Sequence, residues 1–123
     1  MEELDLVGPW EMISLWSKFA QGPEKCLMVA ENPGPVICNK GMSVNPHVTF
    51  GDCPPLDFLL VPGGEGTRRE VDNSSLIQFV AGQATGCKAG FLSVLAHSSF
   101  TGLVCSQISE LLPIGLHCRS CEI

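Results

Sequence analysis

A glycine-rich run, GGEGT at residues 63–67, is the first feature of the chain that could do chemistry. Glycine lets the main chain approach a ligand closely, so the backbone N–H groups of this run could stabilise an anion or an oxyanion. The same run could instead be a tight connection between a strand and a helix. The spacing of the glycines leaves both interpretations open.

Asp5 is a second candidate, because it is an acidic residue between Leu4 and Leu6 in the segment ELDLVG. The pattern favours a helix N-cap, in which the carboxylate accepts hydrogen bonds from backbone N–H groups. If the side chain is buried instead, desolvation favours the protonated carboxyl group, which could then donate a proton in a reaction.

Seven cysteines are spread unevenly over the 123 residues. An odd number without a signal peptide is typical of reduced thiols rather than of a disulfide framework. Cys26 and Cys38 lie in apolar runs and are predicted to be small buried hydrophobic residues. The run HCRSC contains His117, Cys118 and Cys121, and a C-x-x-C pair can bind zinc or exchange disulfides. Zinc needs four ligands and no second C-x-x-C pair is present, so we predict no metal site.

The composition indicates a single globular domain, with 45% hydrophobic residues available for a core. A formal net charge of −6 argues against nucleic acid and anionic membranes as partners. The acidic start, MEELDLVGP, differs from the basic start of a secretory signal. The most apolar run, residues 89–105, contains His97 and is short for a membrane span. We expect a cytoplasmic protein without a membrane segment.

Two helices and several strands are predicted to position these residues. The first helix covers residues 5–20, with Pro9 in its first turn and Gly22-Pro23 after its end. Strands are predicted at residues 25–30, 36–38 and 58–61, the last continuously apolar as in a buried parallel strand. A second helix covers residues 74–83, with Asp72 or Asn73 as its cap and Leu76, Ile77, Phe79 and Val80 as its inner face.

This order of elements indicates an α/β fold with an open parallel sheet. Ligand sites in such sheets form beyond the carboxyl ends of the strands. Gly63, Gly64 and Gly66 directly follow the buried strand, so the fold class places them where a ligand would lie.

Four ordered segments, EELDLVGPWE, NPGPV, TFGDCPPLDFLLVPGGEGTRREVDN and LIQFVAGQA, resemble the ThiJ/PfpI superfamily and in particular its isonitrile hydratase-like branch. The resemblance covers about residues 2–88. It implies a flavodoxin-like α/β fold with helices on both faces of the sheet, related to class I glutamine amidotransferases and usually homodimeric. It also implies a small-molecule substrate, a cysteine nucleophile on a strand-to-helix elbow, and no cofactor. Asp5 matches the acidic residue that contacts the catalytic thiolate, and Gly63 and Gly64 match the glycine pair that faces the reacting atom.

Two parts of the family pattern are missing from the chain. The family has a central strand just before its ELDLVGP-like segment, and here that segment begins at Glu3. After a segment like residues 83–88, the family continues with a strand and a Val-Cys-Thr-Gly elbow, followed by Ala-Gly-Leu-Leu and Arg-Ala-Thr-Thr-His-Trp segments. None of these features, the strand included, is expected in residues 89–123.

A shifted reading frame accounts for the second difference. If each codon is taken one base earlier, the four junctions from Leu92 to Ala96 permit Val-Cys-Thr-Gly. The junctions from Gly102 to Ser106 and from Ser109 to Gly115 permit the two later segments, in the family's order. We therefore predict a partial domain at residues 1–88 and an out-of-frame tail at residues 89–123, in which HCRSC has no function.

The predicted function follows from this division. The chain resembles an isonitrile hydratase that lacks its nucleophile, so whether it is itself an enzyme stays open, and we expect a catalytically incompetent truncated form. Two alternatives remain: the sensory domain of an AraC-type transcription regulator, or a non-enzymatic truncated isoform. The substrate is not determined by the sequence.

Overall fold

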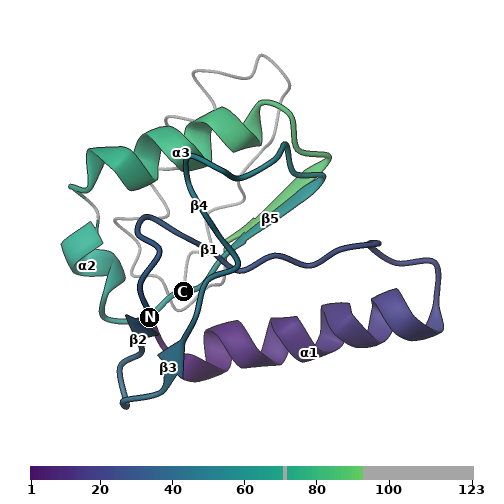
Figure 1. Ribbon diagram of the computed structural model, residues 1–123, viewed down its shortest axis with the longest axis horizontal. Coiled ribbons are helices and arrows are strands. Elements are labelled where there is room, and N and C mark those ends of the chain that lie inside the picture. The colour runs from purple at the N-terminus through teal and green to yellow at the C-terminus, as the bar shows by residue number, and fades with distance from the viewer. Residues whose placement is uncertain (71, 93–123) are drawn as a thin grey trace, which may run out of the picture.

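The computed structural model describes residues 1–70 and 72–92, and within them it places three two-stranded sheets and three helices. The parallel pair β5–β6 and the parallel pair β1–β4 lie between helices α1 and α3, which cover opposite faces (Figure 1). The third sheet is an antiparallel hairpin, β2–β3. This α/β arrangement, with helices on both sides of parallel strands, is the flavodoxin-like fold class predicted from the sequence, in an incomplete form.

The region from β5 to β6 is the more regular part of the molecule. Strand β5 (Phe58–Val61) covers the predicted residues and pairs in parallel with β6 (Ala89–Leu92), from Phe58 opposite Ala89 to Val61 opposite Leu92. Helix α3 (Ser74–Ala84) begins after Asn73, whose side chain accepts a hydrogen bond from the N–H of Leu76. Asn73 is therefore the cap, as one of the two predicted alternatives stated.

Between β5 and α3 the chain forms a short helix that the sequence did not predict, α2 (Thr67–Glu70). Strand β6 was not predicted either. It begins directly after Lys88, whose backbone N–H bonds to the carbonyl of Asp57, 2.7 Å away. This bond fixes the register of β6 at the start of β5.

The strands between α1 and β5 are short. Strand β1 (Val29–Ala30) is two residues long where residues 25–30 were predicted, and it pairs in parallel with β4 (Val48–Thr49). Strands β2 (Val36–Ile37) and β3 (Ser43–Val44) form the hairpin around a turn at residues 39–41. Gly41 has a φ of +94°, a conformation that favours glycine. Strands β3 and β4 were not predicted.

Helix α1 (Glu3–Phe19) begins two residues earlier than predicted, so Pro9 lies inside it and not in its first turn. Proline has no N–H, so the carbonyl of Asp5, four residues earlier, has no helical donor at this position. The helix ends at Phe19, one residue before the predicted end, and Gly22 then passes so close to it that a Cβ there would lie 2.7 Å from the carbonyl carbon of Trp16.

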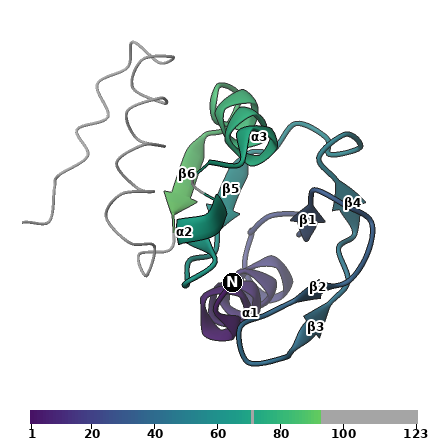
Figure 2. The same ribbon diagram turned by 90° about the vertical axis from the view of Figure 1, so that its left-hand side faces the viewer.

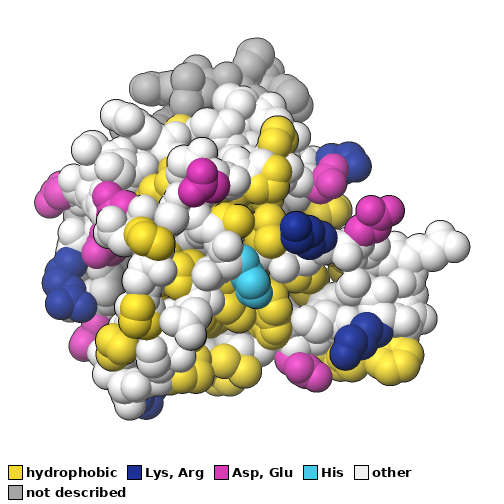
Figure 3. Space-filling view, in the orientation of Figure 1, with side chains coloured by type: hydrophobic (Ala, Val, Ile, Leu, Met, Phe, Trp, Pro, Cys, Tyr) yellow, Lys and Arg dark blue, Asp and Glu magenta, His cyan; other side chains and the backbone are white. Residues whose placement is uncertain are grey.

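Few side chains in the described residues are fully buried. Cys38 and Val80, each 4% exposed, are the buried hydrophobic residues, and Cys26 is half-buried rather than buried as predicted. Hydrophobic side chains gather on the middle of one face, over β1, β5 and the facing side of α1 (Figure 3). Among these residues no helix is both long and apolar enough to cross a bilayer.

Candidate active site

The glycine loop after β5 is held against the first residues of α1. The N–H of Glu2 donates to the carbonyl of Gly63 at 3.0 Å, and Gly63 is buried. Gly64 has a φ of +116°, and a Cβ at this residue would lie 2.6 Å from the nitrogen of Glu2. Glycine is required at residue 64 both for its backbone conformation and for this close approach.

The loop then leads directly into helix α2. The hydroxyl of Thr67 donates to the carbonyl of Gly64 at 2.7 Å, and the N–H of Thr67 bonds to the same oxygen at 3.1 Å. The loop is thus a tight strand-to-helix connection, as one interpretation of its sequence stated. This structural role is compatible with binding of an anion or oxyanion, because the N–H groups of Gly63 and Gly64 donate no hydrogen bond to another described residue.

Asp5 is buried in the first turn of α1, with only 7% of its surface exposed. It is not the N-cap that its sequence pattern favoured, because the helix begins at Glu3 and the N-cap is Glu2. Within the described residues, its Oδ2 atom is buried and has no hydrogen-bond partner. Buried carboxyl oxygens are normally hydrogen-bonded, so this atom is a feature that requires an explanation.

The hairpin turn closes the other side of the first turn of α1. The N–H of Asn39 donates to the carbonyl of Met1 at 2.9 Å, and the N–H of Lys40 donates to Oε1 of Glu3 at 2.6 Å. The ammonium group of Lys40 also pairs with the carboxylate of Glu2. The first residues of the chain are therefore fixed between this turn and the glycine loop.

Three of the four described cysteines, Cys38, Cys53 and Cys87, have a thiol with a raised pKa. Burial raises the pKa of the Cys38 thiol, and the nearby carboxylate of Glu3 raises it further. Burial is also the main cause of the raised pKa values of the Cys53 and Cys87 thiols. The nearby Cys87 raises the pKa of Cys53 further, and Asp57 raises that of Cys87. A catalytic cysteine needs the opposite shift, because the thiolate is the nucleophile.

The structure brings the predicted site residues to one edge of the sheet. Asp5 lies one helical turn from Glu2, which bonds to Gly63, and the loop that contains Gly63 and Gly64 follows the carboxyl end of β5. Because β6 is parallel to β5 in register, the chain leaves β6 at this same edge.

No cysteine occupies the first residues after β6. Ser93, Val94, Leu95 and Ala96 follow Leu92 in the sequence, and the next cysteine is Cys105. Residues 93–123, with the run HCRSC, lie outside the described part of the chain. Among residues 1–70 and 72–92, no three or more His, Cys, Asp and Glu side chains are grouped as a metal site would require.

The contact between Glu2 and Gly63 could not be found from the sequence. The two residues are 61 positions apart, and neither belongs to a pattern that predicts such a bond.

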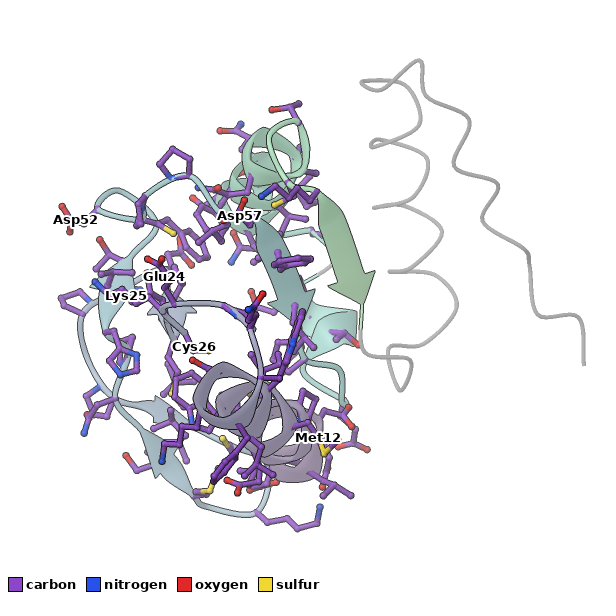
Figure 4. All side chains as sticks on the ribbon, turned by 90° about the vertical axis from the view of Figure 1, so that its right-hand side faces the viewer. Met12, Glu24, Lys25, Cys26, Asp52 and Asp57 are labelled. Carbon is purple, nitrogen blue, oxygen red and sulfur yellow. The ribbon has the colours of Figure 1, made fainter. Side chains whose placement is uncertain are left out.

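The neighbouring segments that surround Glu24, Lys25, Cys26 and Asp57 lead into β1 and β5 from the opposite end of the strands (Figure 4). They take no part in the site.

Comparison with known proteins agrees with the geometry. Residues 1–101 match the family model of the DJ-1/PfpI family. The chain is 32% identical over 85 residues to an isonitrile hydratase from Pseudomonas putida, a stretch that covers 68% of this chain and 35% of that enzyme. A crystal structure of a THiJ/PfpI family protein from Pseudomonas syringae superposes with a TM-score of 0.68 at 27% identity, over 85% of this chain and 41% of that one.

The chain therefore spans well under half the length of the relatives that it matches. Within that span, the parallel strands, the glycine loop after β5 and the acidic residue at the start of α1 all occur together. On the fold and on these matches, the chain belongs to the DJ-1/PfpI family.

Proposed function

We propose that residues 1–92 form the acid and glycine-loop part of an isonitrile hydratase-type active site, and that the chain as it stands lacks the nucleophile. The observation that supports this most directly is Asp5: a buried carboxyl group with one oxygen that has no hydrogen-bond partner among the described residues, one helical turn from the residue that holds the glycine loop. The similarity to the Pseudomonas putida enzyme supports the substrate class.

A buried carboxyl oxygen without a partner among the described residues is suited to contact a nucleophile or a substrate that enters the site. Leaving such an atom unsatisfied costs on the order of 1–3 kcal/mol, and catalytic sites are where such a cost is tolerated. A thiolate or a substrate at the carboxyl edge would supply the missing partner. The N–H groups of Gly63 and Gly64, which donate no hydrogen bond within the described residues, would face the same reacting atom.

The reaction then needs a thiolate and one proton at carbon. In the complete site, the thiolate adds to the terminal carbon of the isonitrile, and Asp5 delivers a proton to that carbon to give a thioimidate. Water adds to the thioimidate carbon, and the C–S bond breaks to release the N-substituted formamide and the thiol. Asp5 acts as general acid in the first step and recovers its proton when the thiolate is regenerated.

Among the described residues, no cysteine is placed to begin this sequence. Cys38, Cys53 and Cys87 have raised pKa values, and none of them follows a parallel strand at the site. We infer that the full 123-residue chain does not hydrate isonitriles.

The test compares the chain with a repaired form. In the repaired form, the segment from residue 89 is translated in the earlier frame and the family's first strand precedes Met1. We expect no loss of the isonitrile infrared band with the original chain and steady formamide production with the repaired one. Turnover by the original chain would contradict the proposal.

Variants of the repaired form test the assigned roles. Asp5→Asn should lower turnover by about 10²–10⁴-fold, as loss of a general acid does, and replacement of the restored cysteine should abolish it. Glu11→Gln, an exposed carboxylate on the same helix, is the matched control and should keep full activity. An Asp5→Asn variant with full activity would remove Asp5 from the mechanism.

The proposal includes a homodimer, since exposed apolar side chains lie along one stripe of α1. The stripe consists of Leu4, Val7, Met12, Leu15, Trp16 and Phe19, and the most exposed are Phe19 at 81%, Leu4 at 71% and Met12 at 68%. Contiguous apolar surface of this kind is typical of interaction sites. Replacement of Met12 and Phe19 by lysine should lower the sedimentation mass of the repaired form from dimer to monomer.

A further inference from the structure

His47 joins the start of the parallel pair β1–β4 through both its backbone and its side chain. The carbonyl of Met28, the residue before β1, accepts from the N–H of His47 at 2.7 Å and from the N–H of Val48 at 3.3 Å. The N–H of Met28 in turn donates to Nδ1 of the His47 imidazole at 2.8 Å. Met28 is therefore bonded to His47 through both its N–H and its carbonyl.

The imidazole ring of His47 also contacts helix α1. It is stacked on the indole of Trp10, with ring centroids 5.8 Å apart and an angle of 15° between the ring planes. Figures 1 and 2 both place α1 below the pair β1–β4. The ring therefore touches two elements at once, the helix through its face and the segment before β1 through Nδ1.

The bond to Met28 sets the protonation state of this ring. A backbone N–H can only donate, so Nδ1 must carry a lone pair, and the proton of the neutral ring lies on Nε2. In the charged form both ring nitrogens carry a proton, and neither can accept. The stack responds in the opposite direction, because a cation within about 6 Å of an indole face is attracted to it. Protonation therefore breaks the contact with Met28 and strengthens the contact with Trp10.

The position of the ring allows this protonation to occur in the folded chain. His47 is exposed, and Figure 3 shows a histidine side chain at the surface among hydrophobic side chains. A proton from solvent can therefore reach the ring without unfolding. Histidine is the side chain whose charge normally changes between pH 5 and 8.

No charged group pairs with the imidazole ring in the described residues. On the elements packed against it, the ionisable residues nearest in sequence to its contacts are Glu11 on α1, Glu24, Lys25 and Cys26 before β1, and Asp52 after β4. The ion pairs of residues 1–70 and 72–92 are those of Lys40 and Lys88, and Asp52 accepts from the hydroxyl of Thr49. The bond to Met28 and the stack on Trp10 are thus the contacts that respond to the charge of the ring.

We propose that His47 is a pH-dependent switch at the start of β1. At neutral and higher pH, the neutral ring joins Met28 to Trp10. At acidic pH, the charged ring stays stacked on Trp10 and releases the N–H of Met28, so that the segment leading into β1 is held at this residue through the Met28 carbonyl. The inference concerns neither Asp5 nor the glycine loop, so it holds whether or not the chain acts on isonitriles.

The experiment follows the full 123-residue chain, labelled with ¹⁵N and ¹³C, by NMR from pH 8 to pH 5. The signals compared are the amide of Met28, the ring carbons of His47 and the amide of Leu76. Leu76 is the internal reference, because its N–H also bonds to a side chain, Oδ1 of Asn73, but to one that does not titrate in this range.

We expect the Met28 amide proton to move upfield as the pH falls, with the same midpoint as the His47 ring carbons. Its protection from hydrogen exchange, corrected for the intrinsic rate, should fall by about three- to tenfold, as loss of one hydrogen bond predicts. The Leu76 amide should keep its shift and its protection. In His47→Gln the Met28 amide should no longer respond to pH, whereas Lys25→Gln, the control for a neighbouring charge, should keep the response.

Three results would overturn the proposal. A Met28 amide that stays unchanged while the ring of His47 becomes charged would show that the two groups are not coupled. The same response of Met28 in His47→Gln would assign it to another ionisable group. Loss of the Leu76 protection at the same pH would show that the whole chain unfolds. Should His47→Gln fail to fold, the original chain still decides, because different midpoints for Met28 and for the ring carbons would contradict the switch.

Discussion

The region from β5 to β6 and the region from α1 to β4 have similar proportions of apolar residues but differ in regularity. The first has a four-residue parallel pair in full register and a helix capped by a side chain. The second has two-residue strands and a helix whose N-cap makes no side-chain hydrogen bond. Six large apolar side chains of α1 are exposed, whereas β5 carries a single one, Phe58.

The difference shows what local signals can and cannot do. Asn73 caps α3 through a residue only three positions away. The run FLLV forms a strand because β6 is present to pair with it. Helix α1 and strand β1 have equally apolar sequences, but each needs a long-range partner. The stability of this region therefore depends on the few contacts that tie it to the other one.

The largest effect is expected where the two regions join, at Gly64. Gly64→Ala forces a side chain into a φ of +116° and places Cβ 2.6 Å from the nitrogen of Glu2. Backbone strain of this kind costs about 1–3 kcal/mol, and the clash adds to it. We expect the urea midpoint, followed by tryptophan fluorescence, to fall markedly.

Gly41→Ala is the matched control for this change. Gly41 also has a positive φ, +94°, but a Cβ there would meet nothing within 4 Å. This variant should show the strain alone and lose about 1–2 kcal/mol. If both variants lost the same amount, the contact between Gly64 and Glu2 would not hold the two regions together.

A smaller effect is expected within the regular region, at the cap of α3. Asn73→Ala removes the acceptor for the N–H of Leu76 and should destabilise the protein by about 1 kcal/mol. Asn73 also donates to Glu31 and Glu70. Asn73→Ser keeps a cap and removes those two bonds, so denaturant titration of both variants separates the two roles. Equal losses would assign the stabilisation to the glutamate contacts rather than to the cap.

The sequence predicted the regular region well and the other one only in part. Strand β5 was predicted with its observed bounds, and α3 to within one residue, because both depend on neighbouring residues. Strand β6 was not predicted, because the residues from 89 onward were interpreted as an out-of-frame tail; its register is set by the bond between Lys88 and Asp57. Its four residues also lie just beyond residue 88, where the predicted domain ended, and the division of the chain at that residue stays a prediction.

The sequence predicted which residues belong to the candidate site but not how they are arranged. Asp5, Gly63 and Gly64 were all identified, but the pattern around Asp5 favoured an N-cap. The helix begins earlier because the N–H of Glu2 is bonded to Gly63, and a contact between residues so distant in the chain leaves no local signal. Burial of Asp5 is a consequence of that contact.

The smallest effect concerns pH and the less regular region, where Cys38 is buried against Glu3. Its thiol has a pKa raised above the ordinary value of 9.0, by burial first and by Glu3 second. Above about pH 9 the unfolded chain therefore holds fewer protons at this group than the folded chain, so folding stability falls as pH rises through the folded pKa. Below pH 9 the thiol is protonated in both states and the slope disappears. Cys38→Ala should flatten the alkaline decline measured by urea titration between pH 8 and 10, whereas Cys53→Ala, at a half-buried thiol shifted in the same direction, should flatten it less. An identical alkaline slope in the original chain and in Cys38→Ala would show that the turn at residues 39–41 does not exclude water from this thiol. The two regions would then differ only in the regularity of their strands.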